Sequence, residues 1–307
     1  MSLVVHEPGL HSLLVDLGRP RSRALGVPLG GAADRAALAL GNALVGNAQD
    51  ALALECTLAG PTLEAQHRTA CVFFGAAFPL TVNERSLPPA TTFTLEPGDR
   101  LRIGGTRAGV RGYLCVAGGF EATSVLDSRS ALEPLKRGDV LACRASWCEP
   151  RGLPFAALAL RSEDSASRLH VIDGPQRDWF PDDRFFTQPY EVSAASNRMG
   201  LRLTGEPLTR TPGELVSEAV APGAVQVTND GLPIVLGVDG QTIGGYPKIA
   251  HVIRADLDAL AQIRPGERVR FVRVTPDEAE AAAKHRLNEL RTWLNRLRIA
   301  ERAPVLV

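Results

Sequence analysis

The sequence has no excess of charge of either sign. Its 307 residues include 34 lysines and arginines and 34 aspartates and glutamates, so the formal net charge is zero. No block of basic residues stands out. Surfaces that bind nucleic acid or anionic membranes concentrate positive charge, so we expect neither kind of partner. Small neutral or anionic ligands and other proteins remain as binding partners.

Paired cysteines and long apolar runs are also lacking. Five cysteines are spread along the chain without a CxxC pair: Cys56, Cys71, Cys115, Cys143 and Cys148. An odd, scattered set argues against a disulfide framework, and we expect these side chains to pack as small apolar groups. No apolar run is long enough to span a bilayer, and the first residues, MSLVVHEPGLHSLL, lack a secretion-signal pattern. We therefore expect a cytoplasmic protein without membrane contact.

Several motifs of nucleotide binding and hydrolysis are missing. The sequence contains no GxxxxGK[ST], no GxGxxG after an expected strand, no HExxH, no GxSxG and no paired-cysteine zinc spacing. These absences disfavour the standard phosphate-binding loops, the zinc hydrolases and the serine hydrolases. We expect no metal site, and no motif in this chain identifies an ATP site.

Short apolar runs separated by glycine and proline dominate the chain, which has 29 glycines and 22 prolines. Runs such as ACVFFGA and RVRFVRV have the length and composition of strands. Three segments place glycine and an acidic residue at a turn before an apolar strand: EPGDRLRI (96–103), KRGDVLAC (136–143) and RPGERVRF (264–271). The predicted fold class is mainly β.

A few helices are predicted between the strands. Asp34 is placed to cap a helix that stops near residue 46, and Asp256 to begin a short one. The last helix has Thr275 as N-cap, Pro276 at its first position and Glu278 completing a capping box. Leucines then recur at spacings of three and four: Leu287, Leu290, Leu294 and Leu297. This amphipathic helix is expected to pack against the body or a partner.

Proline, glycine, serine and charge accumulate at residues 148–168, where we expect a domain boundary. The predicted domains are residues 1–150 and 165–275. A C-terminal helix and tail occupy residues 276–307.

Four stretches combine glycine with polar residues more than strand packing requires: residues 16–34, 196–203, 217–236 and 239–247. In SNRMGLRL, a strand would place Arg198, Gly200 and Arg202 on one face. Two guanidiniums on that face suit a carboxylate or phosphate. A solvated strand face explains them equally well.

The stretch DGQTIGGYP has the groups to hold an amide. Asp239, Gln241 and Thr242 supply a carboxylate, an amide and a hydroxyl. Gly244 and Gly245 are free to take positive φ or to allow a ligand or another backbone to approach. A hairpin turn with its own side-chain hydrogen bonds is the alternative.

A family resemblance runs from about Pro8 to Val274. The segments DLGRP, GVPLGGAAD, ALECTLAGP, GYLCVAGG, DGPQRDWF, SNRMGLRL, LVSEAVAPGAVQV, DGLPIVL and QTIGGYPKIAHVIRADL occur in that order. Together they resemble the allophanate hydrolase subunit 2 or urea amidolyase-related family. Its members include the C subunit of the prokaryotic ATP-dependent 5-oxoprolinase and the carboxyltransferase A and B subdomains of urea carboxylase.

The resemblance implies two β-barrel-containing subdomains of cyclophilin-like type. It implies a C subunit that opens 5-oxoproline to L-glutamate, using ATP in the complete complex. The implied partners are an A subunit and a B subunit, the latter related to allophanate hydrolase subunit 1.

Two alternatives remain within the resemblance. One is a carboxyltransferase acting from carboxybiotin on urea or another amide. Because this chain has no MKM triplet, biotin would then arrive on another protein. The other is a non-catalytic regulator that binds a kinase inhibitor homologous to the B subunit.

Site residues follow from the positions of the motifs. Asp239 and Glu218 are the candidates to orient or deprotonate water. The candidates for substrate binding are Asn197, Arg198, Arg202, Gln226, Gln241, Thr242, Gly244, Gly245 and Tyr246.

Three departures from the family pattern indicate a changed substrate or a lost activity. Val15 precedes Asp16 where relatives have glutamine. Residues 30–34 read GGAAD in place of SGAMD. A glycine-rich segment after Ser130 is missing.

Overall fold

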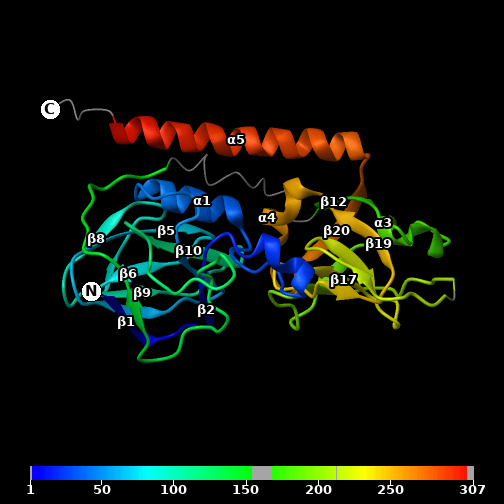
Figure 1. The fold of residues 1–307 in the computed structure, drawn as a ribbon, viewed down its shortest axis with the longest axis horizontal. Helices are drawn as coiled ribbons and strands as arrows, with labels where there is room; N and C mark the ends of the chain where they lie inside the picture. The colour runs from blue at the N-terminus through cyan, green and yellow to red at the C-terminus, as the bar shows by residue number, and fades with distance from the viewer. Residues whose placement is uncertain (1, 154–167, 212, 303–307) are drawn as a thin grey trace. The chain divides into compact units, whose positions relative to one another are not determined.

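The structure is a computed structural model that describes residues 2–153, 168–211 and 213–302 (Figure 1). The chain divides into two compact units. Unit 1 comprises Met1–Gly18, Asp34–Leu160 and Glu289–Val307, and unit 2 comprises Arg19–Ala33 and Arg161–Asn288. Most of the segment in which we expected a boundary, residues 154–167, lies outside the described residues.

Unit 1 contains two antiparallel sheets. The six-stranded sheet has the order β11 (Val140–Ala142), β1 (Ser2–Glu7), β4 (Thr62–Ala65), β9 (Arg100–Ile103), β6 (Leu80–Val82), β7 (Arg85–Ser86). The five-stranded sheet has the order β2 (His11–Val15), β3 (Ala53–Thr57), β10 (Arg111–Val116), β5 (Thr69–Gly75), β8 (Phe93–Leu95).

The core of unit 1 draws apolar side chains from both sheets, among them Leu63, Leu101 and Leu114. In β1 and β9 buried residues alternate with exposed or partly exposed ones, the pattern of a sheet with one face on the core and one in solvent. β10 is buried throughout and β5 nearly so. The outer face of the six-stranded sheet therefore carries polar side chains on β4 and β9, whereas β11 exposes Val140 there.

Helix α1 (Arg35–Leu44) packs on β5 and β10 (Figure 1). Its N-cap is the one expected from sequence, since the Asp34 carboxylate accepts from the amide of Ala37 at 2.9 Å. Gly41 is required by packing, because a Cβ there would lie 2.9 Å from the sulfur of Cys115.

Unit 2 is built around a closed seven-stranded barrel. Its strands follow the order β12 (Arg168–Asp173), β19 (Lys248–Val252), β16 (Ala224–Val227), β17 (Pro233–Leu236), β14 (Gly200–Thr204), β13 (Tyr190–Val192), β20 (Arg268–Arg273). β20 returns to pair with β12 in parallel. The core includes an aromatic cluster in which Phe185 stacks on Phe271 at 4.4 Å between ring centroids. Strands β15 (Glu218–Ala219) and β18 (Ile243–Gly244) form a separate two-stranded sheet.

The remaining helices are short, apart from the last. They are the 3-10 helices η1 (Pro20–Leu25), η3 (Arg177–Trp179) and η4 (Arg254–Asp256), and the α-helices α3 (Arg184–Thr187), α4 (Leu257–Leu260) and α5 (Pro276–Arg302). The capping box of α5 is confirmed: Glu278 Oε2 accepts from the amide of Thr275 at 2.7 Å, and Thr275 Oγ1 accepts from the amide of Glu278 at 3.2 Å.

The three glycine turns recognised in the sequence share one geometry. Gly98, Gly138 and Gly266 have φ between +85° and +89°, which a type II turn requires at its third position. In each turn the following acidic side chain accepts from the amide three residues earlier, at 2.8 to 3.0 Å. Each turn leads into a strand: β9, β11 or β20.

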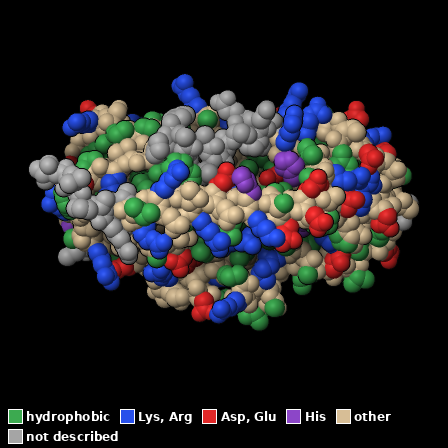
Figure 2. Space-filling view, turned by 90° about the horizontal axis from the view of Figure 1, so that it is seen from above, with side chains coloured by type: hydrophobic (Ala, Val, Ile, Leu, Met, Phe, Trp, Pro, Cys, Tyr) green, Lys and Arg blue, Asp and Glu red, His purple; other side chains and the backbone are tan. Residues whose placement is uncertain are grey.

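The mainly β class, the few helices and the C-terminal helix are confirmed. The expected barrel is present in unit 2, whereas the described strands of unit 1 form two sheets instead. Basic and acidic side chains are interspersed on the face shown in Figure 2, in keeping with the balanced composition. No helix within the described part of the chain has the length and apolar character needed to cross a membrane.

Candidate functional site

Two of the polar stretches singled out in the sequence meet in unit 2. β15 pairs with β18 so that Glu218 lies opposite Gly244. The amide of Val220 extends the pairing by donating to the carbonyl of Thr242 at 3.0 Å. The hairpin interpretation of DGQTIGGYP is therefore incomplete, because this stretch pairs with a segment more than twenty residues earlier.

A buried lysine lies beside this small sheet. Lys248 begins β19, its side chain is 9% exposed, and its ammonium group forms an ion pair with Glu218. Gln176 joins the same group: its Nε2 donates to Glu218 Oε1 at 2.8 Å, and its Oε1 accepts from the amide of Lys248 at 3.0 Å. We call Gln176, Glu218 and Lys248 the lysine cluster.

The ion pair changes what Glu218 can do. The hydrogen bond from Lys248 lowers the pKa of Glu218 below its ordinary value of 4.5; burial opposes this shift, and the bond from Gln176 adds to it. A carboxylate with a lowered pKa is a weak proton acceptor near neutral pH. Glu218 is thus better suited to orient Lys248 than to deprotonate water.

Two glutamine amides approach Gly244 closely. A Cβ on Gly244 would lie 2.6 Å from Nε2 of Gln226 and 2.6 Å from Nε2 of Gln241. Gln226 is buried in β16, opposite Lys248 in the register of β19, and its amide donates to the carbonyl of Tyr246 at 3.4 Å. The sequence left two uses for this glycine, positive φ or the close approach of a ligand or another backbone. Its φ is not positive, and the groups that approach it are the two side-chain amides.

Arg198 and Asp239 form a second group. The Arg198 guanidinium binds the Asp239 carboxylate in a bidentate manner, with Nε to Oδ2 at 2.7 Å and Nη2 to Oδ1 at 3.0 Å. Nη2 also donates to the carbonyl of Gly31 at 2.7 Å. The Arg198 side chain is 7% exposed and that of Asp239 is 32% exposed, so the carboxylate remains partly open to solvent.

The segment Arg19–Ala33 connects the two groups. Its Gly30 amide donates to the carbonyl of Val238 at 2.9 Å, and its Arg23 side chain donates to the carbonyl of Val220. Gly30 and Gly31 have φ of +62° and +73°, a backbone conformation that favours glycine. The prediction that residues 1–150 form one domain thus differs from the structure, in which hydrogen bonds to unit 2 hold this segment there.

The proposed two-arginine clamp is not formed. β14 begins at Gly200, so Arg198 lies in the preceding turn and not on a strand face with Arg202. The Arg202 side chain is exposed. The strand prediction was wrong at this end because Asn197 starts a turn, with its side chain accepting from the amide of Met199 at 2.8 Å.

The other predicted residues are placed as follows. Thr242 is buried and contributes its carbonyl to the pairing with Val220. Tyr246 is 38% exposed, and its carbonyl accepts from Gln226. Gly245 is exposed, and a Cβ there would meet the hydroxyl of Ser217 at 3.3 Å.

Sequence reasoning missed Lys248 and Gln176 as site residues. The signal for Lys248 was present, since PKIAHVI places a charged residue in an otherwise apolar strand, where a lysine is seldom buried without a partner. Gln176 carries no such signal. Its role depends on the contact of η3 with β19.

Four of the five cysteines pack as the sequence predicts. Cys56, Cys71, Cys115 and Cys143 are buried, and Cys148 is partly exposed. Burial raises the pKa of the Cys143 thiol to about 11, so this side chain stays protonated and unreactive near neutral pH. Within residues 2–153, 168–211 and 213–302, no three His, Cys, Asp or Glu side chains are grouped as metal ligands would be.

Unit 2 contains a buried cation, two primary amides and a carboxylate, groups whose chemistry suits an amide ligand. Lys248 supplies a buried cation, Gln226 and Gln241 each offer donors and an acceptor, and Asp239 supplies a carboxylate fixed by Arg198. A cation in a largely desolvated position stabilises negative charge that develops on a neighbouring oxygen.

Comparisons with known proteins identify the family of the chain. Residues 25–273 match the family model described as carboxyltransferase domain, subdomain A and B. The 5-oxoprolinase C subunit of Escherichia coli (strain K12) is 35% identical over 291 residues, which cover 90% of this chain and 93% of that protein. The corresponding C subunit of Haemophilus influenzae is 34% identical, with 92% and 93% covered. The crystal structure of the K. lactis urea amidolyase superposes with a TM-score of 0.87 at 27% identity, over 95% of this chain and 20% of that one.

Proposed function

The chain belongs to the carboxyltransferase family of subdomains A and B, and within that family we propose that it is the C subunit of an ATP-dependent 5-oxoprolinase. In the proposed reaction the lactam of 5-oxoproline is opened to L-glutamate with the help of A and B subunits. The observation that carries the proposal is the match to two proteins named as C subunits of 5-oxoprolinase, over 93% of the length of each.

The lysine cluster suits the chemistry of lactam opening. A resonance-stabilised amide is a poor electrophile, and phosphorylation of its oxygen makes the carbonyl carbon easier for water to attack. Negative charge collects on the oxygens in both steps. Lys248, held by Glu218 and shielded from solvent, is the group that we assign to stabilise that charge.

The neighbouring glutamine side-chain amides are proposed to recognise the lactam. Gln226 and Gln241 are proposed to pair with the ring N–H and carbonyl, since a primary amide offers both a donor and an acceptor. Asp239 is proposed to orient the attacking water, because its carboxylate is one-third exposed and held in place by Arg198. Arg198 is then a positioning residue.

ATP and the partner subunits are part of the proposal. This chain contains neither of the common phosphate-binding motifs, so we assign the binding of ATP to the complete complex rather than to this chain alone. The expected partners are homologues of the A and B subunits.

Reconstitution tests the proposal. The chain is co-expressed with its A and B homologues, and glutamate formation and ATP hydrolysis are measured with and without 5-oxoproline. We expect both activities to require all three chains and the substrate. A complete, stable complex that neither forms glutamate nor hydrolyses ATP in response to 5-oxoproline would overturn the assignment.

A carboxyltransferase is the second candidate. It is favoured by the superposition on the K. lactis urea amidolyase with a TM-score of 0.87 and by the name of the family model. Biotin would have to be supplied on another protein, because no MKM triplet is present. Transfer of labelled carboxyl from a carboxylated biotin protein to urea, without glutamate formation from 5-oxoproline, would favour this candidate instead.

A further inference from the structure

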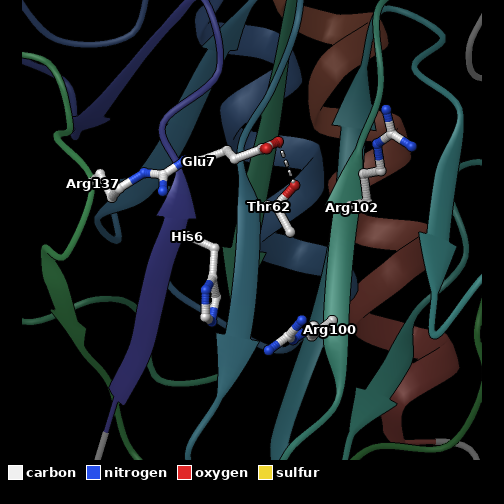
Figure 3. Close-up of a pocket in the computed structure, with 6 residues that line it drawn as sticks. All are labelled: His6, Glu7, Thr62, Arg100, Arg102 and Arg137. Atoms are coloured by element: carbon white, nitrogen blue, oxygen red, sulfur yellow. Dashed lines mark hydrogen bonds between the residues drawn. The ribbon is translucent and has the colours of Figure 1, made fainter.

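The outer face of the six-stranded sheet in unit 1 contains a groove with an excess of positive charge. The groove has a volume of about 500 Å³ and is lined by His6, Glu7, Thr62, Arg100, Arg102 and Arg137 (Figure 3). None of these residues takes part in the lysine cluster or in the Arg198 group, and all belong to unit 1.

Strand register explains why these side chains share one face. Glu7 of β1 lies opposite Thr62 of β4, after a shift in register between Val5 and Glu7, and Thr62 lies opposite Arg102 of β9. Arg100 is two residues from Arg102 and so points to the same side. The turn before β11 is tied to β1, since the amide of Gly138 donates to the carbonyl of Val5 at 2.8 Å. This tie places Arg137 beside the first strand.

Part of the groove is held in place by internal contacts. Glu64 Oε2 is 2.9 Å from His6 Nε2 and 3.1 Å from Arg100 Nε. The bond from Arg100, with that from His6, lowers the pKa of Glu64. Thr62 Oγ1 donates to Glu7 Oε2 at 3.3 Å. Arg100 is therefore oriented before any ligand arrives.

Two other arginines have no such contacts. Within the described part of the chain, the side chains of Arg102 and Arg137 have no hydrogen-bond or ion-pair partner, and both are exposed. In Figure 3, Arg137 reaches toward β1 from one side of the groove, and Arg102 stands on β9 at the other. Adjacent strands lie about 4.8 Å apart, so β1 and β9 are separated by about 10 Å. The three arginines outnumber Glu7 and Glu64 in a chain whose overall charge is zero.

We propose that this groove binds a small ligand carrying two or more phosphate groups. The volume lies in the range of small-molecule sites, about 300 to 1,000 Å³. The lining side chains are all polar or charged, so the groove offers no apolar pocket for an anchoring side chain of a protein partner. The guanidinium fork matches phosphate oxygens, and only a ligand with several charges can reach donors on both sides.

Titration of the full chain with tripolyphosphate tests the proposal. Affinity is measured by calorimetry at fixed ionic strength for the wild type and for the double variant Arg102→Gln with Arg137→Gln. We expect the double variant to bind at least about tenfold more weakly, since it loses charge-assisted hydrogen bonds on both sides. The removed side chains are exposed, and an unchanged circular dichroism spectrum confirms folding.

A second double variant controls for the loss of charge. Arg85→Gln with Arg107→Gln removes two exposed arginines of unit 1 that do not line the groove. Its affinity should equal that of the wild type. Glu7→Gln removes a negative charge from the groove and should bind tripolyphosphate more tightly.

Titrations with other ligands distinguish the possible sources of the phosphate groups. ATP that binds as tightly as tripolyphosphate supports recognition of the phosphate chain alone, and tighter ATP binding supports a nucleotide. Three results would overturn the proposal: no binding to the wild type, equal losses in the groove and control variants, or tighter binding of a polyglutamate peptide than of tripolyphosphate. The last result would identify the groove as a docking site for an acidic protein segment.

Discussion

Arg198 is the residue whose environment differs most from expectation. The sequence suggested that it faces a ligand, yet its guanidinium is buried and donates to both carboxylate oxygens of Asp239 and to the carbonyl of Gly31. Removal of a buried charge partner leaves the other polar groups unsatisfied. Arg202, four residues later, has an exposed side chain, so its removal leaves no buried partner unsatisfied.

This contrast gives a prediction about stability. Arg198→Ala should lower the free energy of unfolding by about 1–3 kcal/mol, because it strips the donors from a carboxylate and a carbonyl. Arg202→Ala should change it by less than about 0.5 kcal/mol, as for ordinary surface positions. Urea denaturation followed by circular dichroism measures both. Equal effects of the two substitutions would contradict the described pairing.

Asp16 is a second residue whose buried side chain accepts several hydrogen bonds. Four groups donate to its carboxylate at 2.6 to 2.8 Å: the hydroxyls of Ser128 and Ser130 and the amides of Arg129 and Gly18. Burial alone would raise the pKa of Asp16, but the hydrogen bonds together outweigh it, and the pKa is lowered from its ordinary value of 3.8. The segment Ser128–Ser130 thus serves to hold this aspartate.

The lowered pKa predicts how stability depends on pH. A carboxylate whose pKa falls on folding stabilises the protein fully above its unfolded pKa and loses that contribution as pH drops through the folded value. Asp16→Asn should therefore be less stable than the wild type by about 1–3 kcal/mol near neutral pH. The difference should persist down to the ordinary value of 3.8 and shrink below it. Unfolding measured across this range checks the sign; a difference that grows at low pH would contradict it.

At the scale of elements, strand β18 depends on a glycine. The amides of Gln226 and Gln241 occupy the space that a Cβ of Gly244 would take, each at 2.6 Å. Gly244→Ala must displace one or both amides, and we expect it to cost about 1–3 kcal/mol by overpacking. Glutamate formation by the complete complex should fall as well, since the two amides are the proposed lactam contacts.

Gly245→Ala is the matched control for that substitution. Its nearest neighbour would be the Ser217 hydroxyl at 3.3 Å, which can rotate away, so unfolding and turnover should stay close to those of the wild type. Identical behaviour of the Gly244 and Gly245 variants would mean that the glutamine amides are not held as described.

Elements defined by local interactions were predictable from sequence. The Asp34 cap, the capping box at Thr275 and Glu278, and the three glycine turns each depend on residues within four positions of one another. The start of β14 was not predictable in this way. The residues whose alternating pattern predicted a strand begin instead with the turn at Asn197. Local propensity does not decide between the turn and the strand.

At the scale of the whole molecule, the features that the sequence did not predict depend on contacts between residues far apart in the chain. Residues Arg19–Ala33 belong to unit 2 although both flanking segments belong to unit 1, and the contacts responsible join residues more than 160 positions apart. The lysine cluster likewise joins Gln176, Glu218 and Lys248 from three separate segments. Resemblance to a family indicated the order of the motifs but not which side chains meet.

The proposed activity depends on the lysine cluster. Among lysines, Lys284 offers a matched control, since its side chain is 70% exposed on α5 and pairs only with Glu280 in the described structure. Lys248→Met and Lys284→Met make the same chemical change in a buried and an exposed position. Assembly with the A and B homologues, followed by size-exclusion chromatography, establishes that each variant enters the complex.

The most direct test is the rate of glutamate formation from 5-oxoproline by these complexes. We predict that Lys248→Met slows turnover by about 100-fold or more, the loss expected when a group that stabilises developing charge is removed, while Lys284→Met matches the wild type. Glutamate formation by the assembled Lys248→Met complex at the rate of its Lys284→Met counterpart would contradict this prediction.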